Sequence, residues 1–160
     1  MVMDPPDPGL RLTFAPFAGD GPDEAKLRAL ADEKGVSDVL SFIGRTSEPH
    51  LHLAASDLFL LTSRWEALPF TIVEAFRAGT PAIATACSGV VELIDDKVGR
   101  VVPIGDVAAI CAAVEDVISD EPKRRAMADA ALLKANEDRF DPEWVHPQFE
   151  KLYLSLKRRA

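Results

Sequence analysis

The sequence predicts an α/β fold built on a mostly parallel, doubly wound sheet. Short apolar runs of strand type alternate with longer segments of helical pattern along most of the chain. This alternation favours parallel strands joined by crossover helices. Start and stop signals agree with it, because Pro69 stands where a helix can begin, and Gly79 and Pro81 stand between its end and the next strand. The 160 residues suit one domain with a sizeable core.

Each element is predicted from its own local signals, in chain order. Strands are expected where short apolar runs occur, at about 10–17, 39–43, 58–61, 82–84 and 98–102. Helical patterns lie between and after them, at about 23–34, 49–55, 69–79, 106–118, 122–136 and 143–157, with a single helical turn at 89–94. Asp23 is expected to be the N-cap of the first helix and Gly35 to end it. Residues 1–9 are proline-rich and are expected to be disordered or a remnant of cloning, which leaves 10–160 as the domain.

Composition narrows the class of protein. The net charge of −8 argues against a nucleic-acid-binding surface. No apolar run approaches the length of a membrane span, and the first residues lack the pattern of a secretory signal. Cys87 and Cys111 are too few for a disulfide framework or a zinc site. Reduced thiols and a cytoplasmic location are therefore expected.

The stretch from Asp57 to Thr85 carries the clearest chemical signal. Two strand-type runs enclose a loop that holds Glu66 and a short helix that holds Glu74 about one turn from its start. The loop follows the carboxyl end of a predicted strand, which is where open α/β sheets bind ligands. The helix start offers free N–H groups and a partial positive charge, so it can hold an anion without a basic side chain.

This stretch resembles the E-x7-E segment of retaining GT-B glycosyltransferases, in the large family of group 1 and family 4-like enzymes. Four other segments resemble the same family in the same order, and they are Gly19–Pro22, Phe42–Gly44, Gly99–Pro103 and Gly105–Asp106. Five ordered segments are far more specific than two glutamates alone. The resemblance implies that the chain is the C-terminal, donor-binding half of a GT-B fold, a Rossmann-like domain.

The resemblance also implies roles for individual residues. Glu66 would be the catalytic-site glutamate that contacts hydroxyls of the donor sugar, and Glu74 would bind the ribose diol of the nucleotide. The backbone at Phe70 and Thr71 would hold the diphosphate. Further donor-binding positions are expected at Ala67, Leu68, Pro69, Gly44 and Arg45. The Gly44 backbone would border the nucleobase, and Arg45 would reach a phosphate or remain solvated. Ala67 and Pro69 depart from the family pattern, which often has glycine there.

The implied substrate is a nucleoside-diphosphate sugar, whose glycosyl group passes to an acceptor hydroxyl with retention. No cofactor and no metal are expected, and His50 and His52 lack acidic or cysteine partners at ligand spacing. The resemblance also implies an N-terminal acceptor domain and a first βα unit that these 160 residues do not contain. A partner domain or chain is therefore expected, and any peripheral membrane association would come only through it.

Two other functions stay open at this point. The chain could be a non-catalytic nucleotide-sugar-binding module, or a subunit that completes another chain. An epimerase of the same architecture would also bind a nucleotide sugar in a two-domain cleft, although the loop from Glu66 to Glu74 fits the transferase pattern better.

Overall fold

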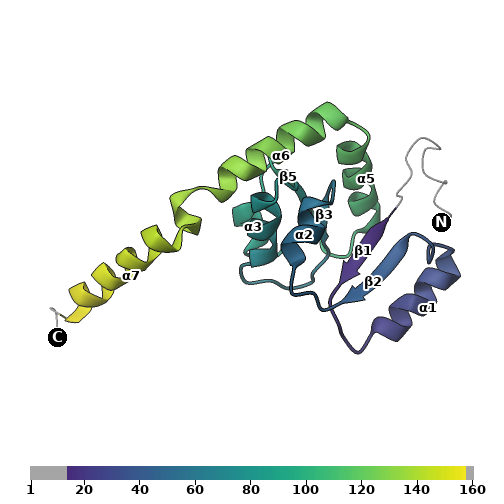
Figure 1. The fold of residues 1–160 in the computed structure, drawn as a ribbon, viewed down its shortest axis with the longest axis horizontal. Coiled ribbons are helices and arrows are strands. Elements are labelled where there is room, and N and C mark those ends of the chain that lie inside the picture. Colours follow the sequence, from purple (N-terminus) through teal and green to yellow (C-terminus); the bar gives the residue numbers. More distant parts are fainter. Residues whose placement is uncertain (1–13, 158–160) are drawn as a thin grey trace. The chain divides into compact units, whose positions relative to one another are not determined.

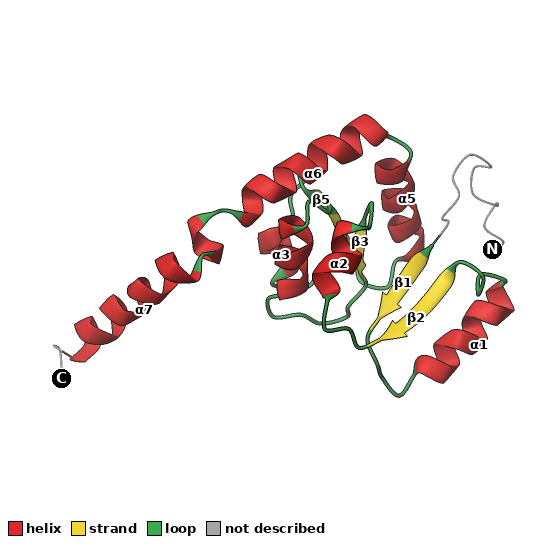
Figure 2. Ribbon diagram, in the orientation of Figure 1, coloured by secondary structure: helices red, strands yellow, loops and turns green. Residues whose placement is uncertain are grey.

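The computed structural model describes residues 14–157 and divides into two compact units. Their described parts are residues 14–52 and 53–157, and each unit is considered by itself. The predictions for residues 1–9, and for the start of the strand at 10–17, lie outside the described residues. The elements are traced in Figure 1 and coloured by type in Figure 2.

The first unit is a pair of parallel strands joined by a helix. Its elements are β1 (Ala15–Ala18), α1 (Glu24–Lys34) and β2 (Leu40–Gly44), followed by α2 (Pro49–Ala54), which crosses into the second unit. Strand β1 pairs in parallel with β2, with Ala15 opposite Leu40. Helix α1 ends at Gly35, whose φ of 67° is left-handed, as the sequence predicts.

Asp23 stands at the N-cap position of α1, as the sequence predicts, but its side chain does not cap the helix. Asp23 has φ −92° and ψ 2°, which is not the extended conformation usual for an N-cap, and its side chain makes no capping hydrogen bond. The carboxylate instead accepts a hydrogen bond from the Lys26 ammonium group at 2.6 Å.

The second unit contains a three-stranded parallel sheet in the order β3-β4-β5. Its strands and helices are β3 (Phe59–Leu61), α3 (Phe70–Arg77), β4 (Ala82–Thr85), α4 (Val90–Leu93), β5 (Gly99–Val102), α5 (Val107–Ile118), α6 (Glu121–Ala135), the 3-10 turn η1 (Asp138–Phe140) and α7 (Pro142–Lys157). Phe59 lies opposite Ala82, and Ala82 lies opposite Gly99. All of these elements except η1 were predicted from the sequence, with bounds that differ by one to a few residues.

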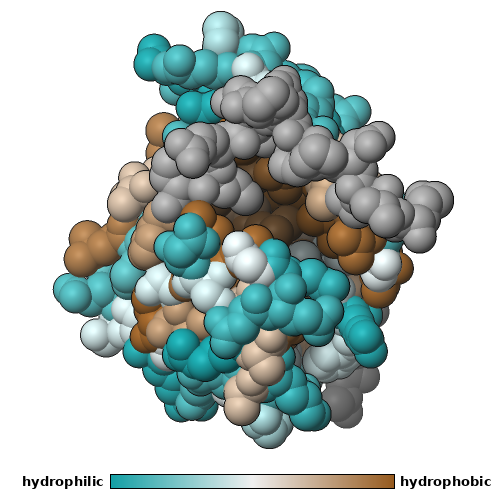
Figure 3. Space-filling model, turned by 90° about the vertical axis from the view of Figure 1, so that its right-hand side faces the viewer, coloured by the Kyte–Doolittle hydropathy of each residue, from teal (hydrophilic) through white to brown (hydrophobic). Residues whose placement is uncertain are grey.

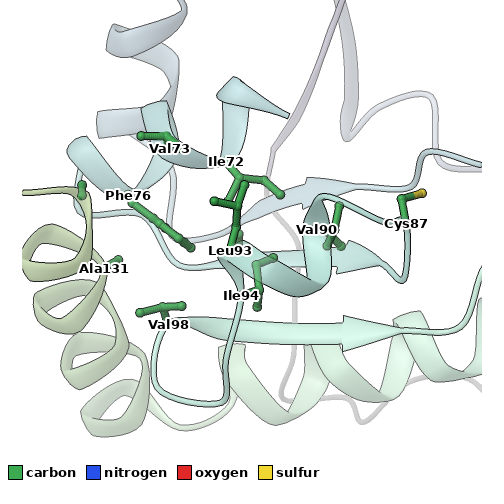
Figure 4. Packing of buried hydrophobic residues seen from close by; sticks show 12 residues of the cluster. Ile72, Val73, Phe76, Cys87, Val90, Leu93, Ile94, Val98 and Ala131 are labelled. Carbon is green, nitrogen blue, oxygen red and sulfur yellow. The ribbon is translucent and has the colours of Figure 1, made fainter. Parts of the chain in front are cut away.

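Helices pack on both faces of β4, so the sheet is doubly wound. Ala82 and Ala84 belong to one buried cluster, together with apolar residues of α3, α4 and α6 (Figure 4). Ile83, which alternates with them, belongs to a second cluster that includes Val102 and Val117. All four residues of β4 are buried, as expected for a central strand covered on both faces.

Helix α3 is bounded as the sequence predicts. Pro69 stands at the N-cap with φ −75°, one residue before the first helical turn. At the other end Gly79 has φ +72°, and its N–H donates to the Phe76 carbonyl. The N–H of Thr80 then donates to the Ala75 carbonyl at 2.9 Å. These bonds close the helix before β4 begins.

The surface carries apolar side chains among polar ones. On the face drawn in Figure 3, hydrophobic residues lie at the surface beside hydrophilic ones. Large exposed side chains include Trp65, Phe70, Leu133 and Tyr153. Among the described residues, no helix is both long enough and apolar enough to span a bilayer.

Candidate functional site

Two loops follow the carboxyl ends of neighbouring parallel strands in the second unit. The loop of residues 62–69 joins β3 to α3, and the loop of residues 86–89 joins β4 to α4. Because β3 and β4 are parallel, both loops emerge at the same edge of the sheet. Glu66 lies in the first loop and Glu74 is the fifth residue of α3, as the sequence predicts.

The carboxylate of Glu66 is half-buried and hydrogen-bonded. The Ser63 hydroxyl donates to Glu66 Oε1 at 2.7 Å, which is in the usual range for an O–H···O bond. Trp65, beside it, is 82% exposed. One oxygen of Glu66 is thus held by the protein, and no described residue donates a hydrogen bond to the other.

Glu74 is exposed on α3. Within the described chain, no hydrogen bond and no ion pair reaches its carboxylate. A solvated, unpaired carboxylate keeps all of its acceptor capacity for a ligand.

The first turn of α3 supplies unpaired backbone donors. Pro69 is buried and its carbonyl accepts from the Ile72 N–H at 3.1 Å. The described residues offer no acceptor to the N–H groups of Phe70 and Thr71. No side chain caps this helix start, so these N–H groups and the partial positive charge there are open to an anion.

The rest of the predicted residues divide between the units. Ala67 and Leu68 are exposed in the same loop as Glu66. Gly44, with φ +64°, and Arg45 belong to the first unit. The Arg45 guanidinium donates to the Asp20 carboxylate at 2.8 Å, an exposed ion pair that sequence analysis did not foresee.

Sequence analysis missed the residues whose hydrogen bonds hold the loop of Glu66 against the neighbouring strand end. These are Ser63, Thr85 and Cys87, which are linked by hydrogen bonds through the Ser63 carbonyl. The spacing Ser63-x-x-Glu66 is the one signal in the sequence that could have indicated part of this arrangement. Cys87 and Cys111 are both free thiols.

The described residues do not bring three His, Cys, Asp or Glu side chains together as a metal site. The expectation that no metal or cofactor is needed stays a prediction, as does the cytoplasmic location.

A parallel sheet with helices on both faces defines a Rossmann-like half domain. The family model for glycosyl transferases group 1 matches residues 10–134, and the chain belongs to that family.

Known proteins from several organisms are similar to the chain. An exopolysaccharide phosphotransferase of Streptomyces coelicolor is 32% identical over 158 residues, which is 97% of this chain and 16% of that protein. An N-acetyl-alpha-D-glucosaminyl L-malate synthase of Bacillus anthracis is 29% identical over 143 residues, which is 89% of this chain and 37% of that protein.

Solved structures agree with the fold. Anabaena HepE, crystallised in complex with UDP-glucose, matches with a TM-score of 0.83 and 26% identity, over 89% of this chain and 41% of that one. A sucrose-phosphate synthase of Thermosynechococcus elongatus matches with a TM-score of 0.80 and 22% identity, over 91% of this chain and 39% of that one. These neighbours confirm the predicted GT-B half. The chain spans less than half the length of each of these relatives.

Proposed function

We propose that this chain is the donor-binding half of a retaining glycosyltransferase that uses a nucleoside-diphosphate sugar. The observation that carries the proposal is the position of Glu66 in the loop after β3, with Glu74 in the helix that follows it, in a chain of this family. The structure of HepE with UDP-glucose supports the choice of donor class. The glycosyl group would pass to an acceptor hydroxyl bound by a further domain or a partner chain.

Each part of the donor would meet a different group of the site. Glu66 would accept hydrogen bonds from hydroxyls of the sugar, and Glu74 from the ribose diol. Hydrogen bonds to a charged acceptor contribute about 1.5–3 kcal/mol each, so two glutamates can provide most of the selectivity for a nucleotide sugar.

The start of α3 would hold the diphosphate. The N–H groups of Phe70 and Thr71 are unpaired in the described chain, and negative charge that develops on the leaving diphosphate would be stabilised there. The chain carries a net charge of −8, so its long-range electrostatic field would not attract an anion. Binding of the diphosphate would therefore depend on the local N–H donors at the start of α3. In this proposal no metal takes part, and chelation of divalent cations with EDTA would leave the affinity for the donor unchanged.

The role of Glu66 is tested by replacing it with glutamine. Glu66→Gln keeps the size of the side chain and removes its charge. We expect the affinity for a bound nucleotide sugar to fall about tenfold or more relative to that for the free nucleotide, because charged acceptors form the stronger bonds. Calorimetric titration with UDP and UDP-glucose, then with the GDP and ADP pairs, measures both affinities.

Glu115→Gln is the matched control, since Glu115 is an exposed glutamate on α5, away from both loops. Equal loss in both variants, or no loss in Glu66→Gln, would contradict the role of Glu66. Transfer of a labelled glycosyl group by the chain alone would exclude a non-catalytic module. Epimerised sugar nucleotide without transfer would indicate an epimerase instead.

A further inference from the structure

Gly89 lies against the backbone of the loop that carries Glu66. A Cβ atom added to Gly89 would stand 1.8 Å from the Ala67 carbonyl oxygen, 2.6 Å from the carbonyl carbon and 2.8 Å from Leu68 Cα. Its φ of −73° is open to any residue, so space and not backbone conformation requires glycine here. Because the obstructing atoms are backbone atoms, a side chain at position 89 would force the loop to move.

The same loop is tied to the end of β4 by two buried donors. The hydroxyl of Thr85 and the thiol of Cys87 both donate to the Ser63 carbonyl oxygen, the thiol at 3.3 Å. Thr85 is 1% exposed and Cys87 is 4% exposed. Because both donor residues are buried, water cannot easily take their place, and the two hydrogen bonds fix the backbone of Ser63 relative to the sheet.

Ser63 connects these hydrogen bonds to the carboxylate of Glu66. Its carbonyl is held from β4, and its hydroxyl donates to Glu66 Oε1 at 2.7 Å. A continuous series of hydrogen bonds therefore runs from Thr85, at the buried end of β4, through the carbonyl and the hydroxyl of Ser63, to Glu66. Gly89 adds a second constraint on the loop, at Ala67.

We infer that Ser63 is a positioning residue that sets the orientation of the Glu66 carboxylate toward the sugar of the donor. The inference rests on the proposed function for the identity of that ligand. The loop is held in place by Thr85, Cys87 and Gly89, so that the Ser63 hydroxyl lies within hydrogen-bonding distance of Glu66. A carboxylate already fixed in its binding rotamer loses less conformational freedom when a ligand binds. The carboxylate oxygens of Glu66 must also meet the hydroxyls of the sugar at defined hydrogen-bond angles, which requires a fixed orientation of the carboxylate.

The first test measures the Glu66 carboxylate without any ligand. The 13C resonance of its Cδ atom, assigned by its absence in Glu66→Gln, is expected to shift in Ser63→Ala and to return close to its native position in Ser63→Thr, which restores a hydroxyl. Ser155→Ala is the control, because Ser155 lies on α7 and its hydroxyl donates to Leu152. An unchanged resonance in Ser63→Ala would overturn the inference.

The second test measures binding of UDP and UDP-glucose, with the ratio of their dissociation constants as the readout. We expect Ser63→Ala to reduce the advantage of UDP-glucose over UDP about five- to tenfold, with the affinity for UDP unchanged. Added to Glu66→Ala, Ser63→Ala should have no further effect on that ratio, because it acts through Glu66. Gly89→Ala should lower the ratio in the same way, whereas Gly21→Ala, where an added Cβ meets no atom within 4 Å, should not.

The possible outcomes distinguish a failure of the inference about Ser63 from a failure of the proposed function. If Glu66→Ala removes the advantage of UDP-glucose and Ser63→Ala does not, the inference fails and the proposed function stands. If wild-type protein shows no such advantage, this result counts against UDP-glucose as the donor, and the carbon resonance alone decides whether Ser63 positions Glu66. If Gly89→Ala does not fold, Ser63→Ala and Ser63→Thr still decide the question.

Discussion

Asp95 is a carboxylate whose proton affinity the fold lowers. The Lys134 ammonium group donates to it at 2.6 Å, and the backbone N–H of Lys97 donates at 2.9 Å. The hydrogen bond from Lys134 is the main reason that the pKa of Asp95 lies below its ordinary value, against a smaller opposing effect of burial. Lys134 is on α6 and only 12% exposed, so this ion pair fastens the loop after α4 to the helix.

This pair predicts a pH-dependent contribution to stability. A carboxylate with a lowered folded pKa stabilises the protein fully above about pH 4, and this contribution is lost as the pH falls through the folded pKa. Because Asp95 is 54% exposed, we expect Asp95→Asn to cost only about 0.5–1 kcal/mol at pH 7. Urea unfolding between pH 7 and pH 2.5 should show that this cost becomes smaller as the pH falls.

Asp129→Asn is the matched control, because Asp129 is exposed and has no ion-pair partner among the described residues. An equal cost of Asp95→Asn at pH 7 and at pH 2.5 would contradict the assignment. The same comparison distinguishes loss of the charged pair from a general effect of replacing a surface aspartate.

At the scale of elements, α3 both carries Glu74 and forms the centre of the core. Ile72, Val73 and Phe76 of this helix are buried in the core (Figure 4). Thr71 and Glu74 of the same helix are exposed. The packing of the buried side therefore also fixes the position of the exposed side, which carries Glu74. Phe76 is fully buried in the cluster that also contains Ala131 of α6.

Phe76→Ala should destabilise the second unit by about 3–5 kcal/mol, because it removes a large buried ring and leaves a cavity. This is a large share of the stability of an ordinary domain, about 5–15 kcal/mol. Urea unfolding followed by circular dichroism measures the change. Phe149→Ala on α7, where the ring is 53% exposed, should change stability by less than about 0.5 kcal/mol. A cost below 1 kcal/mol for Phe76→Ala would contradict the packing described here.

Elements with local signals could be predicted from the sequence. Pro69 and Gly79 bound α3 as expected because proline and glycine act through their own backbone preferences. Asp23 occupies the predicted N-cap position, but its side chain makes no capping hydrogen bond, because that bond depends on a backbone conformation that the residue type alone does not determine. The contact of Gly89 with Ala67 could not be predicted, since it joins segments 22 residues apart and depends on how β3 and β4 pair.

At the scale of the whole molecule, the family and the fold are established and the reaction is a proposal. The five ordered segments led to the right family, which matches residues 10–134. The described chain forms two compact units, with the candidate glutamates in the second and Gly44 and Arg45 in the first. Sequence position alone could not separate them, because strands of both units read as one alternating pattern. A complete reaction requires an acceptor site as well, and the relatives are more than twice as long as this chain.

The most direct test of the central claim is a calorimetric titration of the folded chain with UDP, GDP and ADP, using wild-type protein and Glu74→Ala. Glu115→Ala serves as the exposed-glutamate control on α5. We predict that one nucleotide binds selectively, and that Glu74→Ala weakens its binding about tenfold or more while Glu115→Ala does not. Absence of binding by all three nucleotides to a cooperatively folded chain, or equal affinities in wild type and Glu74→Ala, would contradict the account.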